Sequence, residues 1–436
     1  MRSMIGTLAR HGSWVVLAIM IGGAIATAPA QNANAQTAGN DDRLLAAYKQ
    51  AIDDARHGRY LEGSYGLLDR LGVASPDQIA DSDIFDQWTQ VMSCMTGLST
   101  FNSVKTEPDY HTAPGDLETL RNAQGVPALP AIIERARHTR IVILDENHLD
   151  PRGRAFGLEV ARALRPLGYT LLAVETLTKD GDDAASRAKM DKLSTDGYVR
   201  RSSGYYIDDP VFADFLRQSM ALGYHLLSYE STRPAQQEER EQDQTDNLIR
   251  RALQQNPGAK LLVYAGEHHV AEGPIAVEGN GFEWMAGRLK RLSGIDPLTI
   301  DQAGLSPIPM NRPDADLSSL AVAKAAGGGS VVLMRRGKPL SVGLLGGAVD
   351  LQVVHPRDIP VAGRPGWLAG MGRAPVSVPG FLLPTSGVRL IQAFIAGEAE
   401  DAVPVDQILV KAGQSAPPLM LPATPIRYAV QDWPAS

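Results

Sequence analysis

The chain has 436 residues, a formal net charge of −7 and a hydrophobic fraction of 44%. This length predicts two or three domains, and this apolar content is enough for a sizeable buried core. We expect no nucleic-acid partner, because phosphate binding needs a concentrated basic face and the chain has no long Lys/Arg run.

The first segment, residues 1–35, has the pattern of a secretory signal peptide. Arg2 and Arg10 precede an apolar run, and two small-x-small sites follow, at residues 28–30 and 33–35. The alternative is an uncleaved membrane anchor, but the run is short for a span of about 20 residues. We expect cleavage after the second site, export to a bacterial periplasm or medium, and no stable membrane insertion afterwards.

Residues 38–104 are expected to form a small helical region. Between residues 44 and 72 apolar side chains recur at spacings of three and four, which predicts a helical hairpin. Cys94 is the only cysteine, so no internal disulfide can form. It lies among apolar neighbours and is interpreted as a small core residue, which excludes cysteine-protease chemistry and thiolate metal sites.

Residues 105–305 alternate between strand-length apolar runs and helical segments. Helices are predicted from about Pro151, from Asp209-Pro210, over 236–255 and near 282–292. Near-continuous apolar strands alternating with helices favour an α/β fold, a mostly parallel sheet with helices on both faces. The predicted strands are residues 140–146, 170–175, 225–230, 260–266 and 297–301.

Residues 306–436 are richer in Gly and Pro, and we expect a β-rich or irregular C-terminal region. Residues 327–343 are predicted to form a hairpin, and residues 349–354 a further strand. Two alternatives stay open for the remainder: it wraps the α/β domain, or it forms a small β-rich module.

Charged side chains follow every predicted strand of the α/β domain. Ligands bind beyond the carboxyl ends of strands in an open parallel sheet. A single charge after a strand can simply mark the point where the chain returns to solvent. Several carboxylates on one rim repel each other, however, unless cations lie among them or their pKa values are moved apart. The pattern therefore predicts a shared cleft. These residues are Asp145-Glu146, Glu175, Glu230, Glu267-His268-His269 and Asp301.

Two motifs in this set resemble a known superfamily. Glu146-Asn147-His148 follows an apolar strand, and Gly266-x-x-His269 follows a later one. The combination resembles the superfamily that groups the erythromycin esterases, the haem-binding ChaN lipoproteins and the Tiki/TraB proteases. The likeness covers about residues 105–305. Asp145 stands where that family usually has a glycine.

The resemblance also implies a glutamate after the second strand and an arginine on a later helix, which are Glu175 and Arg240 here. At 100° per residue, however, Arg240 and Asn247 lie opposite the apolar Leu248, which a solvated helix face explains equally well. Both interpretations of Arg240 are kept.

The first functional hypothesis is hydrolysis of an ester, lactone or amide in a small molecule or peptide. The carboxylates and imidazoles suit Mn²⁺, Zn²⁺ or Co²⁺, which would lower the pKa of a bound water. In a metal-free version, a glutamate-oriented histidine deprotonates water and Arg240 stabilises the oxyanion. His268 is the less favoured imidazole and Glu267 a supporting acceptor. The expected metal ligands are Glu146, His148, Glu175 and His269.

Two alternatives remain. The resemblance to ChaN implies a haem or iron carrier, for which Tyr206 or Tyr229 would be an axial ligand, with Tyr205 a third possibility. The third hypothesis is a degenerate α/β scaffold whose N-terminal helices bind a partner. For each tyrosine, ordinary packing is the competing interpretation.

Overall fold

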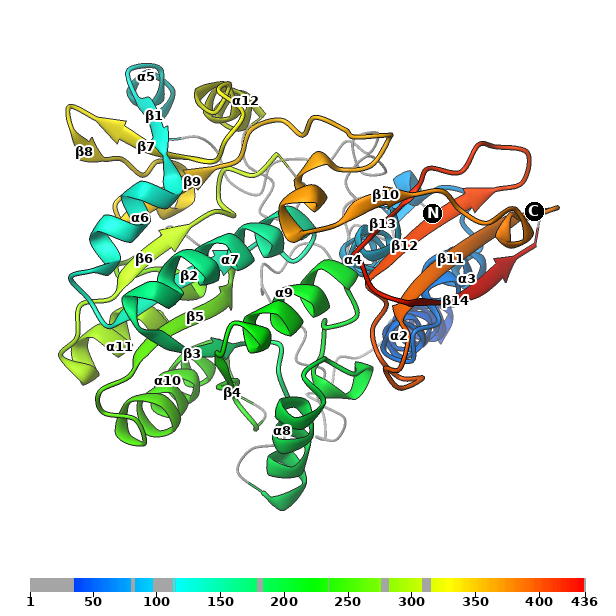
Figure 1. The fold of residues 1–436 in the computed structure, drawn as a ribbon, viewed down its shortest axis with the longest axis horizontal. Helices are drawn as coiled ribbons and strands as arrows, with labels where there is room; N and C mark the ends of the chain where they lie inside the picture. Colours follow the sequence, from blue (N-terminus) through cyan, green and yellow to red (C-terminus); the bar gives the residue numbers. More distant parts are fainter. Residues whose placement is uncertain are drawn as a thin grey trace.

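We describe a computed structural model of the chain. The structure describes residues 35–79, 83–96, 113, 115–178, 183–233, 235–275, 282–307 and 315–434. The signal peptide expected for residues 1–35 lies, apart from Ala35, outside the described residues. Figure 1 shows a larger α/β part beside a smaller part, in which the first helices meet the last strands.

A central sheet of nine strands runs through the larger part of the described chain, in the order β1-β7-β9-β6-β2-β5-β3-β4, with β8 paired to β7. The neighbours from β9 to β4 pair in parallel, and β1, β7 and β8 join antiparallel. The α/β fold with a mostly parallel sheet is therefore confirmed. The strands are β1 Gln124–Pro127, β2 Ile141–Glu146, β3 Tyr169–Val174, β4 His225–Ser228, β5 Lys260–Gly266, β6 Leu298–Asp301, β7 Val331–Arg335, β8 Lys338–Pro339 and β9 Leu351–Val354.

Helices cover both faces of this sheet because side chains alternate along each strand. Val142 and Leu144 of β2 pack with α6, α7 and α9, whereas Ile141 and Ile143 pack with α10 and α11. A π-helical turn over Ile249–Gln254 continues α10. These helices span α6 Ala128–Ala136, α7 Pro151–Leu164, α9 Pro210–Ala221, α10 Gln237–Leu248 and α11 Met285–Ser293.

The sheet continues past residue 305, the end expected for the α/β domain, to Val354 of β9. The hairpin predicted within 327–343 is present as β7 and β8, and the strand predicted at 349–354 as β9. A third core forms there between α5 (Asp116–Arg121), α12 (Ala315–Lys324) and β7. Pairing between distant strands has no local signal, so the sequence did not show that this hairpin extends the sheet.

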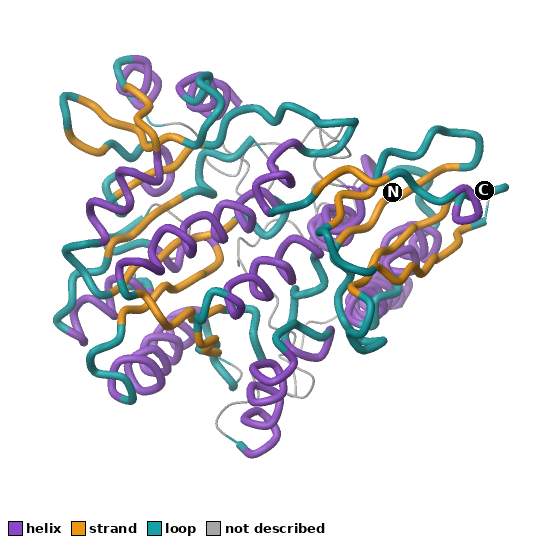
Figure 2. The backbone as a smooth tube through the Cα atoms, viewed as in Figure 1, coloured by secondary structure: helices purple, strands orange, loops and turns teal. Residues whose placement is uncertain are grey.

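The smaller part joins the two ends of the chain. Phe85 and Trp88 of α4 share a core with Leu390 of β11, and Gln431 of β14 donates a hydrogen bond to Gly58 O at 2.6 Å. The last strands thus form a module on the N-terminal helices, as Figure 2 shows. Residues 97–104 of the expected helical region lie outside the described residues. The elements are α2 Ala35–Arg56, α3 Tyr60–Leu71, α4 Asp83–Thr96, β11 Val388–Ile395, β12 Asp406–Lys411 and β14 Ile426–Trp433.

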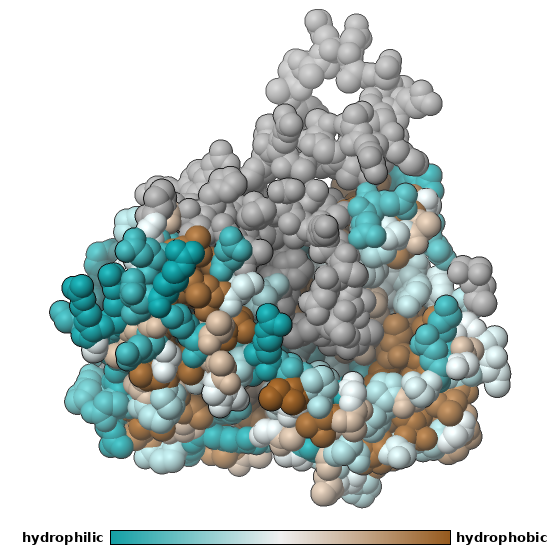
Figure 3. All heavy atoms as spheres, turned by 90° about the horizontal axis from the view of Figure 1, so that it is seen from above, coloured by the Kyte–Doolittle hydropathy of each residue, from teal (hydrophilic) through white to brown (hydrophobic). Residues whose placement is uncertain are grey.

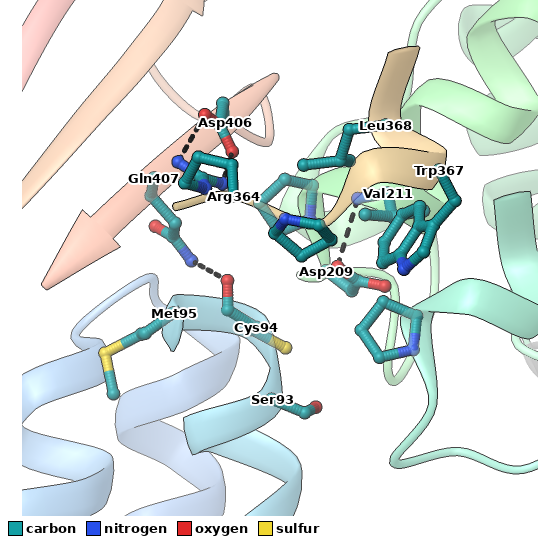
Figure 4. A pocket seen from close by; sticks show the side chains of 13 residues that line it. Ser93, Cys94, Met95, Asp209, Val211, Arg364, Trp367, Leu368, Asp406 and Gln407 are labelled. Carbon is teal, nitrogen blue, oxygen red and sulfur yellow. Dashed lines mark hydrogen bonds and ion pairs between the residues drawn. The ribbon is translucent and has the colours of Figure 1, made fainter. Parts of the chain in front are cut away.

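Cys94 lies where the two parts meet. It lines a cavity with the starts of α7 and α9 and with β12, and its sulfur points into that cavity (Figure 4). Burial raises the pKa of the thiol well above its usual range. The thiol therefore stays protonated near neutral pH, as expected of a packing residue rather than a nucleophile.

Within the described part of the chain, every helix falls short of the length and apolarity that crossing a membrane requires. Hydrophilic and hydrophobic residues are interspersed on the described surface seen from above in Figure 3.

Candidate functional site

The carboxyl ends of four neighbouring strands, β2, β5, β3 and β4, meet at one edge of the sheet. Glu146 at the end of β2 pairs with Gly266 at the end of β5, and the backbone N–H of Glu175, just after β3, donates to Tyr264 O of β5 at 3.2 Å. The five expected catalytic residues lie together there, and all are buried: Glu146, His148, Glu175, Arg240 and His269.

The first histidine–glutamate pair joins His148 to Glu146. His148 Nδ1 lies 2.8 Å from Glu146 Oε1, so this nitrogen carries the hydrogen. Arg154 Nε donates to the other oxygen of Glu146 at 2.7 Å, and Arg154 Nη1 donates to Asp209 at 2.6 Å. The ring of Tyr206 lies 4.4 Å from the His148 ring. We call Glu146, His148 and Arg154 the His148 group.

Helix starts position the His148 group. Asp150 caps α7 by accepting from Arg152 N, with Pro151 at the first helical position, so Arg154 lies in the first turn. Asp209 caps α9 in the same way, as the sequence predicted. Both helices begin at the carboxyl edge of the sheet, which brings Arg154 to Glu146.

Charges fix the protonation of this pair. Burial raises the pKa of Glu146, but Arg154 and His148 outweigh it, and the pKa is lowered overall. Burial lowers the pKa of His148, but the hydrogen bond and charge of Glu146 outweigh it, and the pKa is raised. Glu146 is therefore an ionised partner that orients Nδ1 and leaves Nε2 directed to the site.

Gly266 provides the space for His148 Nε2. A Cβ on residue 266 would lie 2.8 Å from His148 Cε1, 2.9 Å from His148 Nε2 and 2.9 Å from Glu175 Oε2. The backbone N–H of Gly266 also donates to Glu175 Oε2. The imidazole and the Glu175 carboxylate therefore both occupy the space that a side chain at residue 266 would need.

The second pair joins His269 to Glu241 of α10. His269 Nδ1 lies 2.8 Å from Glu241 Oε1, and Nε2 lies 3.1 Å from Arg240 Nη1 and 3.5 Å from Glu175 Oε1. Burial alone would lower the pKa of His269, but the charges of Glu241 and Glu175 raise it to about 10. This imidazole is a cation at neutral pH. We call His269, Glu241, Arg240 and Glu175 the His269 group.

Arg240 lies in the first turn of α10 and is only 5% exposed. Its Nε donates to Glu230 at 3.0 Å, and its Nη2 bonds both Glu230 and Glu175. Asn247 on the same face donates to Tyr229 O at 3.0 Å. This face of α10 therefore packs on the strand ends and does not face solvent, because the helix starts at the edge of the sheet.

Glu267 and His268 follow Gly266 in a short turn. Glu267 has φ 33°, is 6% exposed, and its Oε1 has no hydrogen-bond partner within the described residues. Burial raises the pKa of Glu267 to about 7, against the charge of His148. His268 packs on Trp284 with ring centres 5.3 Å apart, and burial lowers its pKa to about 4. The two histidines of this turn thus have opposite protonation preferences.

Asp145 and Asp301 belong to a structural network beside the site. Asp145 accepts from Gln302 N at 2.7 Å, and Asp301 accepts from Gly304 N at 2.8 Å. Burial, followed by the charge of Asp301, raises the pKa of Asp145 well above its usual range. These effects favour the protonated form of Asp145, and its hydrogen bond with Gln302 N connects β2 to the residue that follows β6.

The tyrosines considered for haem ligation have packing roles. Tyr229 is 0% exposed and donates to Tyr264 O at 3.3 Å, and burial raises its pKa well above the usual range. The Tyr206 ring packs against the His148 ring at an interplanar angle of 47°, and Arg56 lies over the Tyr205 ring. An axial phenolate needs an ionised, accessible oxygen. These residues do not fit a haem site as arranged.

The expected metal ligands are engaged with other protein groups. Glu146 and Glu175 accept hydrogen bonds from guanidinium groups, and each histidine Nδ1 lies against a glutamate. Across the described ranges, no group of three or more His, Cys, Asp and Glu side chains is arranged to hold a metal ion. The donor set does not fit Mn²⁺, Zn²⁺ or Co²⁺ unless the arginines move.

Sequence reasoning missed Arg154 and Glu241 as site residues. Both are charged residues in helices, where a solvated face is the ordinary interpretation. One feature of the sequence could have indicated Arg154. It lies in the first turn of a helix that begins at Asp150-Pro151, just after the first predicted strand. Glu241 adjoins Arg240, so an inward first turn of that helix would have implicated it.

No family model and no curated protein matches the chain. Among solved structures, the type III effector HopBA1 is similar at 13% identity and a TM-score of 0.29, over 58% of this chain and 98% of that one. RRSP, a MARTX toxin effector domain from Vibrio vulnificus CMCP6, is similar at 13% identity and a TM-score of 0.30, over 64% and 65%. At these values a shared activity is not implied, so the function must be inferred from the site itself.

Proposed function

We propose that the chain is an exported hydrolase that activates water with His148 and cleaves an ester, lactone or amide of a small molecule or peptide. One observation carries the proposal: two histidine–glutamate pairs, each with an arginine, meet in one buried site at the strand ends. The resemblance of this chain to the erythromycin esterase, ChaN and Tiki superfamily supports the same hypothesis.

His148 is the proposed general base. Glu146 holds the hydrogen on Nδ1, so the neutral form of His148 accepts a proton from water at Nε2. The hydroxide adds to the substrate carbonyl carbon, and the bond to the leaving group then breaks. The imidazolium, stabilised by Glu146, returns its proton to the leaving oxygen or nitrogen. Arg154 keeps Glu146 ionised throughout.

The His269 group supplies fixed positive charge. His269 is an imidazolium at neutral pH, and Arg240 lies 3.1 Å from it. Preorganised donors in a buried site stabilise an oxyanion without reorganisation. We assign the tetrahedral intermediate's oxyanion to this side of the site, opposite the base. Every proposed step uses water and the chain's own side chains.

The test is a hydrolysis assay with p-nitrophenyl esters, a chromogenic lactone and aminoacyl p-nitroanilides. We expect the wild-type protein to hydrolyse at least one class, and His148→Gln to lose that activity while its circular dichroism spectrum is unchanged. Hydrolysis of no class by folded wild-type protein, or equal rates for the variant, would reject the proposal.

A further inference from the structure

One carboxylate of the site lacks the partners that the others have. Glu146, Glu175 and Glu241 each accept hydrogen bonds from an arginine, a histidine or a backbone N–H. Glu267 is also buried, at 6% exposure, yet its Oε1 has no hydrogen-bond partner in the described part of the protein. A buried acceptor without a donor is destabilising, so its retention points to a ligand that supplies the donor.

The backbone places this carboxylate next to the proposed base. Gly266 immediately precedes it, and the His148 ring and Glu175 lie where a side chain at residue 266 would be. His269 follows two residues later in the same turn. Glu267 also has a positive φ of 33°, which a non-glycine residue rarely adopts. A group bound to Glu267 would therefore lie near the proposed base.

The surrounding charges select the kind of group. Glu267 is influenced by the negative Glu175 and by Asp86 of α4, and by the positive His148 and His269. Glu146 is already neutralised by Arg154, and Glu241 pairs with His269. The carboxylate of Glu267 therefore has no paired cation within the described part of the site. A cationic N–H donor would complement its charge, whereas an anion would be repelled.

We propose that Glu267 binds a free amino group of the substrate, so that the preferred substrate is an ester or amide with an ammonium close to its carbonyl. This proposal rests on the proposed hydrolase and adds its substrate class. Glu267 is a binding residue here, and His148 remains the base.

The test compares glycine p-nitroanilide with N-acetylglycine p-nitroanilide at pH 7.5, in wild-type protein and Glu267→Gln. We expect kcat/KM for the free amine to exceed that of the acetylated substrate at least tenfold in wild type. In Glu267→Gln the ratio of the two kcat/KM values should fall to about one, because the KM for the free-amine substrate rises. Glu272→Gln is the matched control, since Glu272 bonds Lys290 and Thr299 away from His148. A preference kept by Glu267→Gln, or missing in wild type, would overturn the proposal.

Binding separates the two proposals. Calorimetry and thermal unfolding of wild-type protein with glycinamide and N-acetylglycinamide need no turnover and no variant. Binding and stabilisation by glycinamide alone, without hydrolysis of any probe, would support the amine site and reject the hydrolase. Hydrolysis with equal effects of the two amides would support the hydrolase and reject the amine site.

Discussion

The two histidine–glutamate pairs differ in how completely their imidazoles are engaged. In the His148 group, Glu146 holds Nδ1, while Nε2 lies in the space left by the missing side chain of Gly266. In the His269 group, Glu241 holds Nδ1, and both Arg240 and Glu175 approach Nε2. Similar residues at adjacent strand ends therefore have different chemistry: one imidazole can exchange a proton, and the other is held as a cation.

The difference comes from the number of carboxylates in ion-pair contact with each ring, which among the described residues is one for His148 and two for His269. His269 lies between two of them, and its pKa is raised to about 10. The partner of His148, Glu146, is itself neutralised by Arg154. A fixed cation beside a titrating base is the division of roles on which the proposed hydrolysis depends.

The largest effect on stability is expected when the His269 group loses Arg240. Arg240→Met leaves Glu175 and Glu230 buried without their shared cation, so the free energy of unfolding should fall by about 3–5 kcal/mol. Arg233→Met is the control: Arg233 is 57% exposed and pairs with Asp243, so about 0–1 kcal/mol is expected. Urea denaturation measures both, and equal losses would contradict the assigned role of Arg240.

The cation at His269 also predicts a pH dependence. The folded-state pKa of about 10 exceeds the unfolded value of 6.5, so its stabilisation is complete below pH 6.5 and is lost as the pH rises toward 10. The free energy of unfolding should fall between pH 7.5 and 9.5 by up to about 1.4 kcal/mol per pH unit. His269→Gln should lack this component. The same slope in the variant would show that His269 is neutral in the folded protein.

A smaller effect is expected at Gly266, which separates the two groups. In Gly266→Ala the new Cβ would meet the His148 ring and Glu175, and moving them should cost about 1–3 kcal/mol and reduce turnover. Gly258→Ala has open space around its Cβ and should change stability by less than about 0.5 kcal/mol. Thermal unfolding with parallel rate measurements compares the two. Unchanged turnover in Gly266→Ala would place His148 elsewhere.

The strand ends of the site were predictable from sequence, whereas the contacts between groups were not. Each apolar run that stops at a charge marks a strand end, and parallel strands bring such ends to one edge. This reasoning identified Glu146, Glu175 and His269. The helix residues Arg154 and Glu241 carry no such signal, because a charge in a helix usually faces solvent. Their role depends on where each helix begins relative to the sheet, which is a tertiary property.

The same limit applies to the fold. The alternating pattern between residues 105 and 305 predicts the parallel sheet, since local periodicity reports burial on both faces. The packing of α4 against β11 joins residues about three hundred positions apart, and no local pattern encodes it. The sequence therefore left open whether the C-terminal strands wrap the α/β domain or form a module.

The most direct test measures initial rates on the best substrate for wild-type protein before and after dialysis against EDTA, and for His148→Gln and His268→Gln. We predict an unchanged wild-type rate after dialysis, a loss of roughly 10²–10⁴-fold for His148→Gln, and near wild-type activity for His268→Gln. Retained activity in His148→Gln would contradict the account, as would a rate that EDTA abolishes and Zn²⁺ or Mn²⁺ restores.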